Sequence, residues 1–252
     1  MTRSKIALVF SGQPRSAHLS YEFYARNLLN DHDVDVLGCF WRSDTPVDFG
    51  DWTFDTLEWL DPAPFAAEHA GILAYYSKTH SAHFPAENAL FMLQCLSASW
   101  GLVQKPYDFV IRARTDFALN RSFDFGTMER GKIYQPNSEK RAGAISGNDQ
   151  FAIGSPKVMQ VYMSAITSAR AFVASGDHVA GEHLIDFHLK HSGFSADDVV
   201  ALDMNDPFPP SGIDVMPNSL LRGDYATWRG ISHARQRRTL RERLRRAVAK
   251  LW

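Results

Sequence analysis

Two apolar segments, about a hundred residues apart, end abruptly in polar and charged residues. The first covers residues 5–10 and is followed by Ser11-Gly-Gln-Pro-Arg15, and the second covers residues 107–111 and is followed by Arg112-Ala-Arg-Thr-Asp116. Short, continuous apolar runs of this kind are typical of buried strands in a parallel sheet. Because ligands of open α/β sheets bind at the carboxyl ends of the strands, we expect the two polar segments to form one site.

The rest of the chain alternates between strand and helix patterns, which predicts an α/β fold with a mixed, mainly parallel sheet flanked by helices. Residues 46–85 have no clean period and predict loops and short helices. Residues 136–148 predict a long polar loop of the binding or lid type. Further strands are predicted at 34–40, 108–113, 132–135 and 150–153, and helices at 16–30, 85–103, 156–173 and 181–191.

Composition indicates an ordinary globular protein with a sizeable core, since 45% of the 252 residues are hydrophobic and 22% are charged. Cys39 and Cys95 both lie in apolar runs and are expected to be buried, reduced thiols. The first strand pattern begins at Lys5, which leaves no room for a signal peptide, and no apolar run has the length of a membrane span. We therefore expect a cytoplasmic protein.

The last eighteen residues, 235–252, have a formal charge of +7, so the remaining chain carries −8. Leu240, Leu244, Val248 and Leu251 fall on one helical face and arginines fill the rest. The sequence thus predicts one domain over 1–233 and a basic amphipathic helix over 234–252, suited to an anionic inner-membrane surface. Packing on the acidic body or on a partner subunit is an alternative; nucleic acid is the least favoured partner because stacking aromatics are missing.

Several common chemistries lack their motifs in this sequence. Neither G-x-G-x-x-G nor G-x-x-x-x-G-K-[ST] follows the first strand, which argues against a dinucleotide-binding fold and a P-loop enzyme. H-E-x-x-H and G-x-S-x-G are also missing, so the ten histidines do not indicate a zinc peptidase or a serine hydrolase. A nucleotide would have to be bound by side chains and isolated backbone amides.

The two polar segments supply groups of this kind. Ser11, Gly12, Gln13 and Arg15 are candidate ligand-binding residues, although Ser-Gly-Gln-Pro is also compatible with a simple turn. On a strand, residues 112, 114 and 116 point to the same face, which places two guanidinium groups and one carboxylate in a row. Two adjacent arginines repel each other unless an anion joins them, and Arg binds phosphate as a bidentate fork, so the pattern favours a diphosphate over an Arg–Asp salt-bridge ladder.

The order of these motifs resembles that of bacterial glycosyltransferases of the GT-A fold, which build lipopolysaccharide and capsule. The resemblance covers roughly residues 5–190: the strand with Ser11-Gly-Gln-Pro-Arg15, the helix before Tyr107–Asp116, and Asn148-Asp-Gln-Phe-Ala-Ile-Gly154. It implies a nucleotide-sugar donor whose base and ribose lie at the first strand, with Ser11, Gly12, Gln13, Arg15, Arg112 and Arg114 binding the donor.

The resemblance also places Arg114-Thr-Asp116 at the family's Asp-x-Asp metal-binding motif, but Arg114 stands where the first Asp would be. A divalent cation, Mn²⁺ or Mg²⁺, on Asp116 would then need the diphosphate and a C-terminal group such as His233. Alternatively, Arg112 and Arg114 neutralise the diphosphate and no metal is needed.

Asp149 and Glu182 are the candidate bases, since in an inverting transfer a carboxylate takes the proton of the attacking acceptor hydroxyl. In a retaining transfer neither need be a base. The expected activity is transfer of a sugar from a nucleotide sugar to a saccharide, or lipid-linked saccharide, in surface-polysaccharide synthesis. The alternatives are a sugar-phosphate nucleotidyltransferase, whose long glycine-rich basic loop is missing here, and a non-catalytic nucleotide-binding or scaffold module.

Overall fold

The structure is a computed structural model that describes residues 3–14, 17–43, 46–79, 86–119, 121–136, 145, 147–176 and 180–202. The basic C-terminal helix predicted over 234–252 therefore lies outside the described residues. Among the helices that are described, none combines the length and apolar character needed to cross a membrane.

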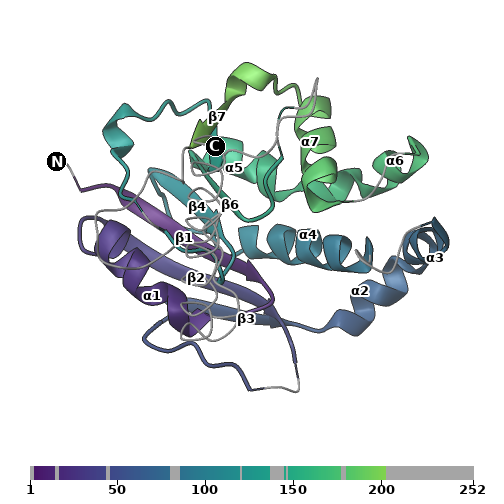
Figure 1. Ribbon diagram of the computed structural model, residues 1–252, viewed down its shortest axis with the longest axis horizontal. Helices are drawn as coiled ribbons and strands as arrows, with labels where there is room; N and C mark the ends of the chain where they lie inside the picture. Colours follow the sequence, from purple (N-terminus) through teal and green to yellow (C-terminus); the bar gives the residue numbers. More distant parts are fainter. Residues whose placement is uncertain are drawn as a thin grey trace, which may run out of the picture.

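The described residues form a seven-stranded mixed sheet, which confirms the predicted α/β class. The strands lie in the order β3-β2-β1-β4-β6-β5-β7, and only β6 runs against its neighbours (Figure 1). The strands are β1 (Lys5–Gly12), β2 (Asp33–Trp41), β3 (Thr56–Leu60), β4 (Phe109–Ala113), β5 (Ile133–Pro136), β6 (Phe151–Gly154) and β7 (Val199–Leu202).

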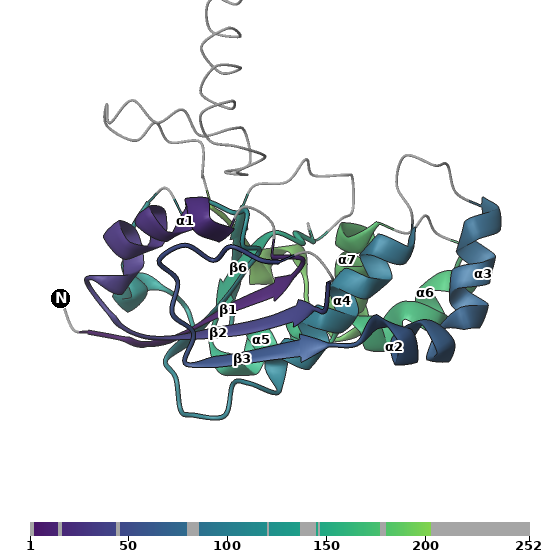
Figure 2. The same cartoon turned by 90° about the horizontal axis from the view of Figure 1, so that it is seen from below.

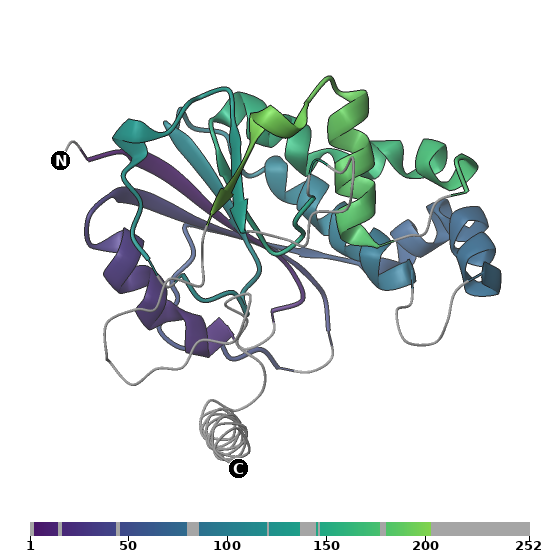
Figure 3. The same cartoon turned by 45° about the horizontal axis from the view of Figure 1, so that its top comes forward.

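Helices cover both faces of this sheet, as the views in Figures 1 and 3 show. One core contains alternate residues of β1, such as Ala7 and Val9, packed against α4, α5 and α7. The other contains Ile6, Leu8 and Phe10 of the same strand, packed against α1. The helices are α1 (Ala17–Tyr24, continued by a π-helical turn at Ala25–Leu29), α2 (Pro62–Glu68), α3 (Ala70–Thr79), α4 (Ala86–Trp100), α5 (Pro156–Met163), α6 (Ala169–Ala174) and α7 (Gly181–His191).

The sheet has a topological switch point between β1 and β4. The chain leaves β1 through α1 to reach β2 on one side, and it reaches β4 on the other side through α4, which covers the opposite face. In open α/β sheets, ligands bind outside the carboxyl ends of the two strands at such a point. Both polar segments singled out in the sequence follow these two strands.

Three expectations about elements are wrong, and one strand was missed. β3 falls in a region predicted to be loops and short helices, and β7 was not predicted at all. The helix expected over 156–173 is divided by a 3₁₀ turn at Ala165–Ser168. In addition, β4 ends at Ala113 and a turn follows, in which Phe117 N donates to Arg114 O (3.1 Å), so residues 112, 114 and 116 do not share one strand face.

Beyond the carboxyl end of β3, α2 and α3 extend the molecule past the sheet (Figures 1 and 2). Asp61 caps α2 by accepting a hydrogen bond from Ala63 N (2.9 Å), and Pro62 occupies the first helical position, where its missing N–H costs nothing. Phe65 of this helix packs on Trp41 of β2 and on Phe91 of α4.

Candidate functional site

The ends of β1 and β4 are joined by side-chain hydrogen bonds. Arg112 Nε donates to Ser11 Oγ (3.1 Å), and Thr115 Oγ1 donates to the carbonyl of Gln13 (3.3 Å). Ser11 is buried, whereas the side chain of Gln13 is exposed. The structure therefore brings the two polar segments together at the switch point, as the sequence predicts.

Arg114 forms a bidentate ion pair with Asp116. Arg114 Nε lies 2.9 Å from Asp116 Oδ1 and Arg114 Nη2 lies 2.6 Å from Asp116 Oδ2. The turn after β4 makes this pairing, because it brings residue 116 back over residue 114. The side chain of Asp116 is 5% exposed and that of Arg114 is 23% exposed, so the guanidinium is the part of the pair that solvent reaches.

Arg112 is completely buried (0% exposed) and is the largest fully buried side chain among the described residues. Besides Ser11, it donates through Nη1 to the carbonyl of Asp149. From its position beside Arg114 in the sequence, Arg112 is expected to bind the donor diphosphate. At zero exposure its guanidinium has no surface on which a ligand from solvent can bind, so direct contact with a diphosphate does not fit this structure.

Asp149 and Glu182, the two candidate bases, are also brought together here. Asp149 Oδ2 lies beside Gly181, the first residue of α7 and the neighbour of Glu182. Burial, followed by the charge of Asp149, raises the pKa of Glu182 to about 7. Arg114 opposes this rise. Burial lowers the pKa of Arg114, but the charges of Asp116, Asp149 and Glu182 raise it by more, so the guanidinium stays charged.

Two glycines allow this approach between the 145–150 segment and α7. A Cβ on Gly147 would lie 2.1 Å from the Glu182 carbonyl oxygen, so only glycine fits against the first turn of α7. A Cβ on Gly181 would lie 2.6 Å from Met92 Cε and 3.5 Å from Asp149 Oδ2. The Asp149 carboxyl therefore lies at the amino-terminal end of α7, where the helix dipole favours negative charge.

Asn148 shapes the backbone that carries Asp149. Its Oδ1 accepts hydrogen bonds from Gln150 N (2.8 Å) and Phe151 N (3.0 Å), which makes an Asx turn directly before β6. Gln135 Oε1 accepts from Asn148 N (3.1 Å), and the Tyr162 hydroxyl donates to Asn148 O. Sequence reasoning missed Gln135 and Tyr162; a polar residue at the end of a short buried strand was the signal for Gln135.

Cys95 of α4 contacts the end of β1. Gly12 N donates to Cys95 Sγ (3.2 Å), and this thiol in turn donates to the carbonyl of Cys39 (2.8 Å). Both cysteines are buried and free, as the sequence predicts, and their sulfur atoms lie 3.9 Å apart. Gly12, with a φ of +113°, therefore has its amide satisfied from within the protein.

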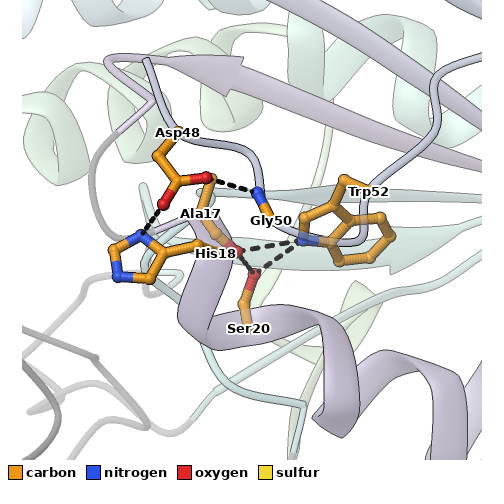
Figure 4. A network of polar contacts seen from close by, with 6 residues as sticks. All are labelled: Ala17, His18, Ser20, Asp48, Gly50 and Trp52. Atoms are coloured by element: carbon orange, nitrogen blue, oxygen red, sulfur yellow. Dashed lines mark hydrogen bonds and ion pairs between the residues drawn. The ribbon is translucent and has the colours of Figure 1, made fainter. Parts of the chain in front are cut away.

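The segment after β2 packs on the first turn of α1, close to the end of β1 (Figure 4). Trp52 Nε1 donates to Ala17 O (3.1 Å) and to Ser20 Oγ (3.1 Å). The Trp52 ring also meets the rings of Phe10 and Tyr24 edge to face. A buried aromatic with a satisfied N–H fixes the start of α1 relative to β1.

A tight turn brings this segment back toward α1. Asp48 Oδ1 accepts from Gly50 N (2.8 Å), and the other Asp48 oxygen lies 4.0 Å from His18 Nδ1 (Figure 4). Gly50 has a φ of +59°, and a Cβ there would lie 2.9 Å from His18 Cα. Glycine is thus required both by backbone conformation and by close approach.

The remaining predicted site residues, Arg15 and His233, lie outside the described residues. The proposed metal ligand Asp116 has both oxygens bound to Arg114, so in this arrangement it offers no free oxygen to a cation. Within the part of the chain that the structure describes, no three His, Cys, Asp or Glu side chains lie close enough together to hold a metal ion. The predicted cation site also includes the donor diphosphate and His233, so it stays a prediction.

Comparison with known proteins does not assign the chain to a family. No protein-family model matches the sequence, and no curated protein matches it either.

Proposed function

We propose that the protein is a glycosyltransferase of the GT-A type that moves a sugar from a nucleotide-sugar donor to a saccharide acceptor. The donor would lie outside the carboxyl ends of β1 and β4, with the Ser11-Gly12-Gln13 segment next to the nucleoside. The mainly parallel sheet with its switch point between these strands supports this placement.

One observation carries the proposal: a partly exposed cation and a carboxyl pair lie together at this edge of the sheet. Arg114 N donates to the carbonyl of Gln150 (2.9 Å), directly after Asp149, and Asp149 Oδ2 lies at the start of α7, next to Glu182. Glycosyl transfer needs both kinds of group, a cation for the leaving phosphate and a base for the attacking hydroxyl.

In the proposed reaction, the acceptor oxygen forms a bond to the anomeric carbon as the bond from that carbon to the phosphate oxygen breaks. The bonding electrons leave with the nucleoside diphosphate, and the guanidinium of Arg114 stabilises the developing negative charge. In an inverting transfer, the hydroxyl proton passes to the Asp149–Glu182 pair. A pKa of about 7 suits Glu182 to proton transfer near neutral pH.

No step of this mechanism is assigned to a metal ion, because Arg114 already occupies the Asp116 carboxylate. If no metal takes part, Arg114 contacts the diphosphate, whereas Arg112 stays buried and bonds to Ser11 and to the carbonyl of Asp149. Nucleotide titrations with and without Mn²⁺ distinguish binding that needs a metal ion from binding that does not.

The products released from a panel of nucleotide sugars test the proposal. A glycosyltransferase slowly hydrolyses its own donor, so we expect nucleoside diphosphate to appear with at least one of them. A nucleotidyltransferase would instead release pyrophosphate from a nucleoside triphosphate and a sugar phosphate. Release of pyrophosphate, or of no product from any donor, would contradict the proposed activity.

A further inference from the structure

Three buried side chains, each from a different element, hold three consecutive peptide groups, from the amide of Asn148 to the carbonyl of Asp149. Arg112 of β4 donates to the carbonyl of Asp149, and Tyr162 of α5 donates to the carbonyl of Asn148. Gln135 of β5 accepts from the amide of Asn148. Arg112 and Tyr162 are 0% exposed and Gln135 is 1% exposed, so all three bonds are shielded from water.

The sheet register explains why two of these side chains, Arg112 and Gln135, reach the same stretch of backbone. Arg112 is paired with Ala152 of β6, and the pairing of Tyr134 with Ile153 places Gln135 opposite Ala152 from the other side. Arg112 and Gln135 therefore flank Ala152 on the same face of the sheet. Since Ala152 has only a methyl group, both longer side chains have room to extend toward the peptide that precedes β6.

Burying the charged guanidinium of Arg112 has a high desolvation free energy, which packing alone does not explain. The acceptors of its hydrogen bonds are a hydroxyl and a backbone carbonyl, and its Nη2 has no hydrogen-bond partner among the described residues. A buried guanidinium without a carboxylate directly on it loses its hydration and regains little. The desolvation of Arg112 is explained if its role is to fix the position of the backbone at residues 148 and 149.

We propose that Arg112, Tyr162 and Gln135 are positioning residues that fix the backbone of Asn148 and Asp149 and thereby hold the Asp149 carboxyl at the start of α7, next to Glu182. On the other side, Gly147 lies directly on the backbone of Glu182, so the peptide is confined between the sheet and α7. The importance of the carboxyl pair rests on the proposed function. The positioning itself is independent of any substrate.

The ionisation of Glu182 reports on this geometry. The charged groups that act on it are Asp149, which raises its pKa, and Arg114, which lowers it. Glu182 in turn acts on Tyr162, whose pKa burial raises to about 12. If Asp149 moves away, Glu182 loses a neighbouring negative charge, and its titration midpoint must fall.

The test is a ¹³C NMR titration of the glutamate side-chain carboxyls in the full chain, with Glu182→Gln used to assign the signal. We expect the Glu182 midpoint to fall by about 1 pH unit in Tyr162→Phe. Tyr134→Phe is the matched control. It also removes a buried tyrosine hydroxyl, which accepts a hydrogen bond from the backbone Glu129 N (2.7 Å) and lies away from the carboxyl pair. It should leave the midpoint unchanged.

A double variant distinguishes positioning from a general loss of structure. In an Asp149→Asn background the carboxyl that Tyr162 positions is gone, so adding Tyr162→Phe should no longer shift the Glu182 midpoint. If Tyr162→Phe does not fold, Gln135→Met removes the acceptor for Asn148 N and is expected to give the same shift. A Glu182 midpoint that is unchanged in these variants, or that shifts equally with and without Asp149, overturns the assignment. Because the titration uses no nucleotide, its outcome is separate from that of the proposed activity.

Discussion

At the scale of single residues, Arg114 and Asp116 show how a backbone turn changes the role of a side chain. On a continuous strand both would face a ligand, whereas the turn after Ala113 lets them bind each other. Asp116 thereby becomes the partner that keeps a largely buried arginine charged and oriented. Arg114, with about a quarter of its side chain exposed, is the cation that remains accessible.

Removing one partner of this ion pair should cost more stability than removing both. Asp116→Ala leaves a mostly buried guanidinium unpaired, and we expect a loss of about 2–3 kcal/mol in the free energy of unfolding, reduced somewhat by the exposure of Arg114. Urea denaturation of Asp116→Ala, Arg114→Met and the double variant measures this. If the double variant loses as much free energy of unfolding as the two single variants added together, the pair is not coupled.

Glu182→Gln should remove a pH dependence of stability. The pKa of Glu182 is raised from its usual 4.5 to about 7 in the folded protein. Between these values the folded state keeps a proton that the unfolded chain has released, so the stabilisation is complete below pH 4.5 and is lost as the pH rises through about 7.

At pH 8 we therefore expect the free energy of unfolding of Glu182→Gln to exceed that of the wild-type protein by up to about 3 kcal/mol. At pH 4.5 the two proteins should unfold at similar urea concentrations. Ser192→Ala, an exposed change without a titratable group at the other end of α7, is the control and should not alter the pH profile of unfolding. A wild-type advantage at pH 8 would show that Glu182 is not under strain when ionised.

At the scale of elements, the contact between the 145–150 segment and the start of α7 positions both carboxyl groups. Sequence patterns predicted α7 and β6 with accurate boundaries, because each has a clear apolar period. They could not predict that the two elements meet at Gly147, because nothing local distinguishes a glycine needed for close approach from one in a flexible loop. β3 was missed for a related reason: it is an edge strand with an exposed Leu57 and lacks the apolar run by which β1 and β4 were recognised.

Gly147→Ala should separate these two elements. Its methyl group would lie 2.1 Å from the Glu182 carbonyl oxygen, which is backbone and has no rotamer with which to move aside. We expect destabilisation by about 1–3 kcal/mol and a fall in the Glu182 titration midpoint. Gly71→Ala is the control: nothing lies within 4 Å of its Cβ, and in α3 alanine should be neutral or stabilise by up to about 1 kcal/mol. Equal melting temperatures for the two variants would show that Gly147 is not confined by α7.

At the scale of the whole molecule, the two edges of the sheet differ in chemistry. The edge at the carboxyl ends of β1 and β4 has the buried arginine, the ion pair and the carboxyl pair. The opposite edge has exposed ion pairs such as Arg130 with Asp108 (3.1 Å), which contribute little. The sequence predicted the first edge as the site because the apolar runs end there, but it could not predict that Arg112 would be buried and would bind a backbone carbonyl.

The basic C-terminal segment supports a separate proposal, peripheral attachment to an anionic membrane surface. Residues 235–252 carry a formal charge of +7, and each basic residue contributes about 1 kcal/mol near an anionic leaflet. We expect the full chain, but not a chain ending at residue 234, to sediment with phosphatidylglycerol-containing vesicles at low salt. Donor hydrolysis should be unaffected by the truncation. Sedimentation of the shortened chain would assign the binding to another part of the protein.

Calorimetric titration with UDP, GDP and CMP, with and without Mn²⁺, tests the central claim most directly. We predict that at least one nucleotide binds and that Arg114→Ala weakens its affinity by tenfold or more, about 1.4 kcal/mol, because a charge-assisted contact with phosphate is lost. Arg130→Ala, at the opposite edge, should bind as the wild-type protein does. Absence of binding by all three nucleotides, or equal affinities for the two arginine variants, would contradict a nucleotide-sugar site between β1 and β4.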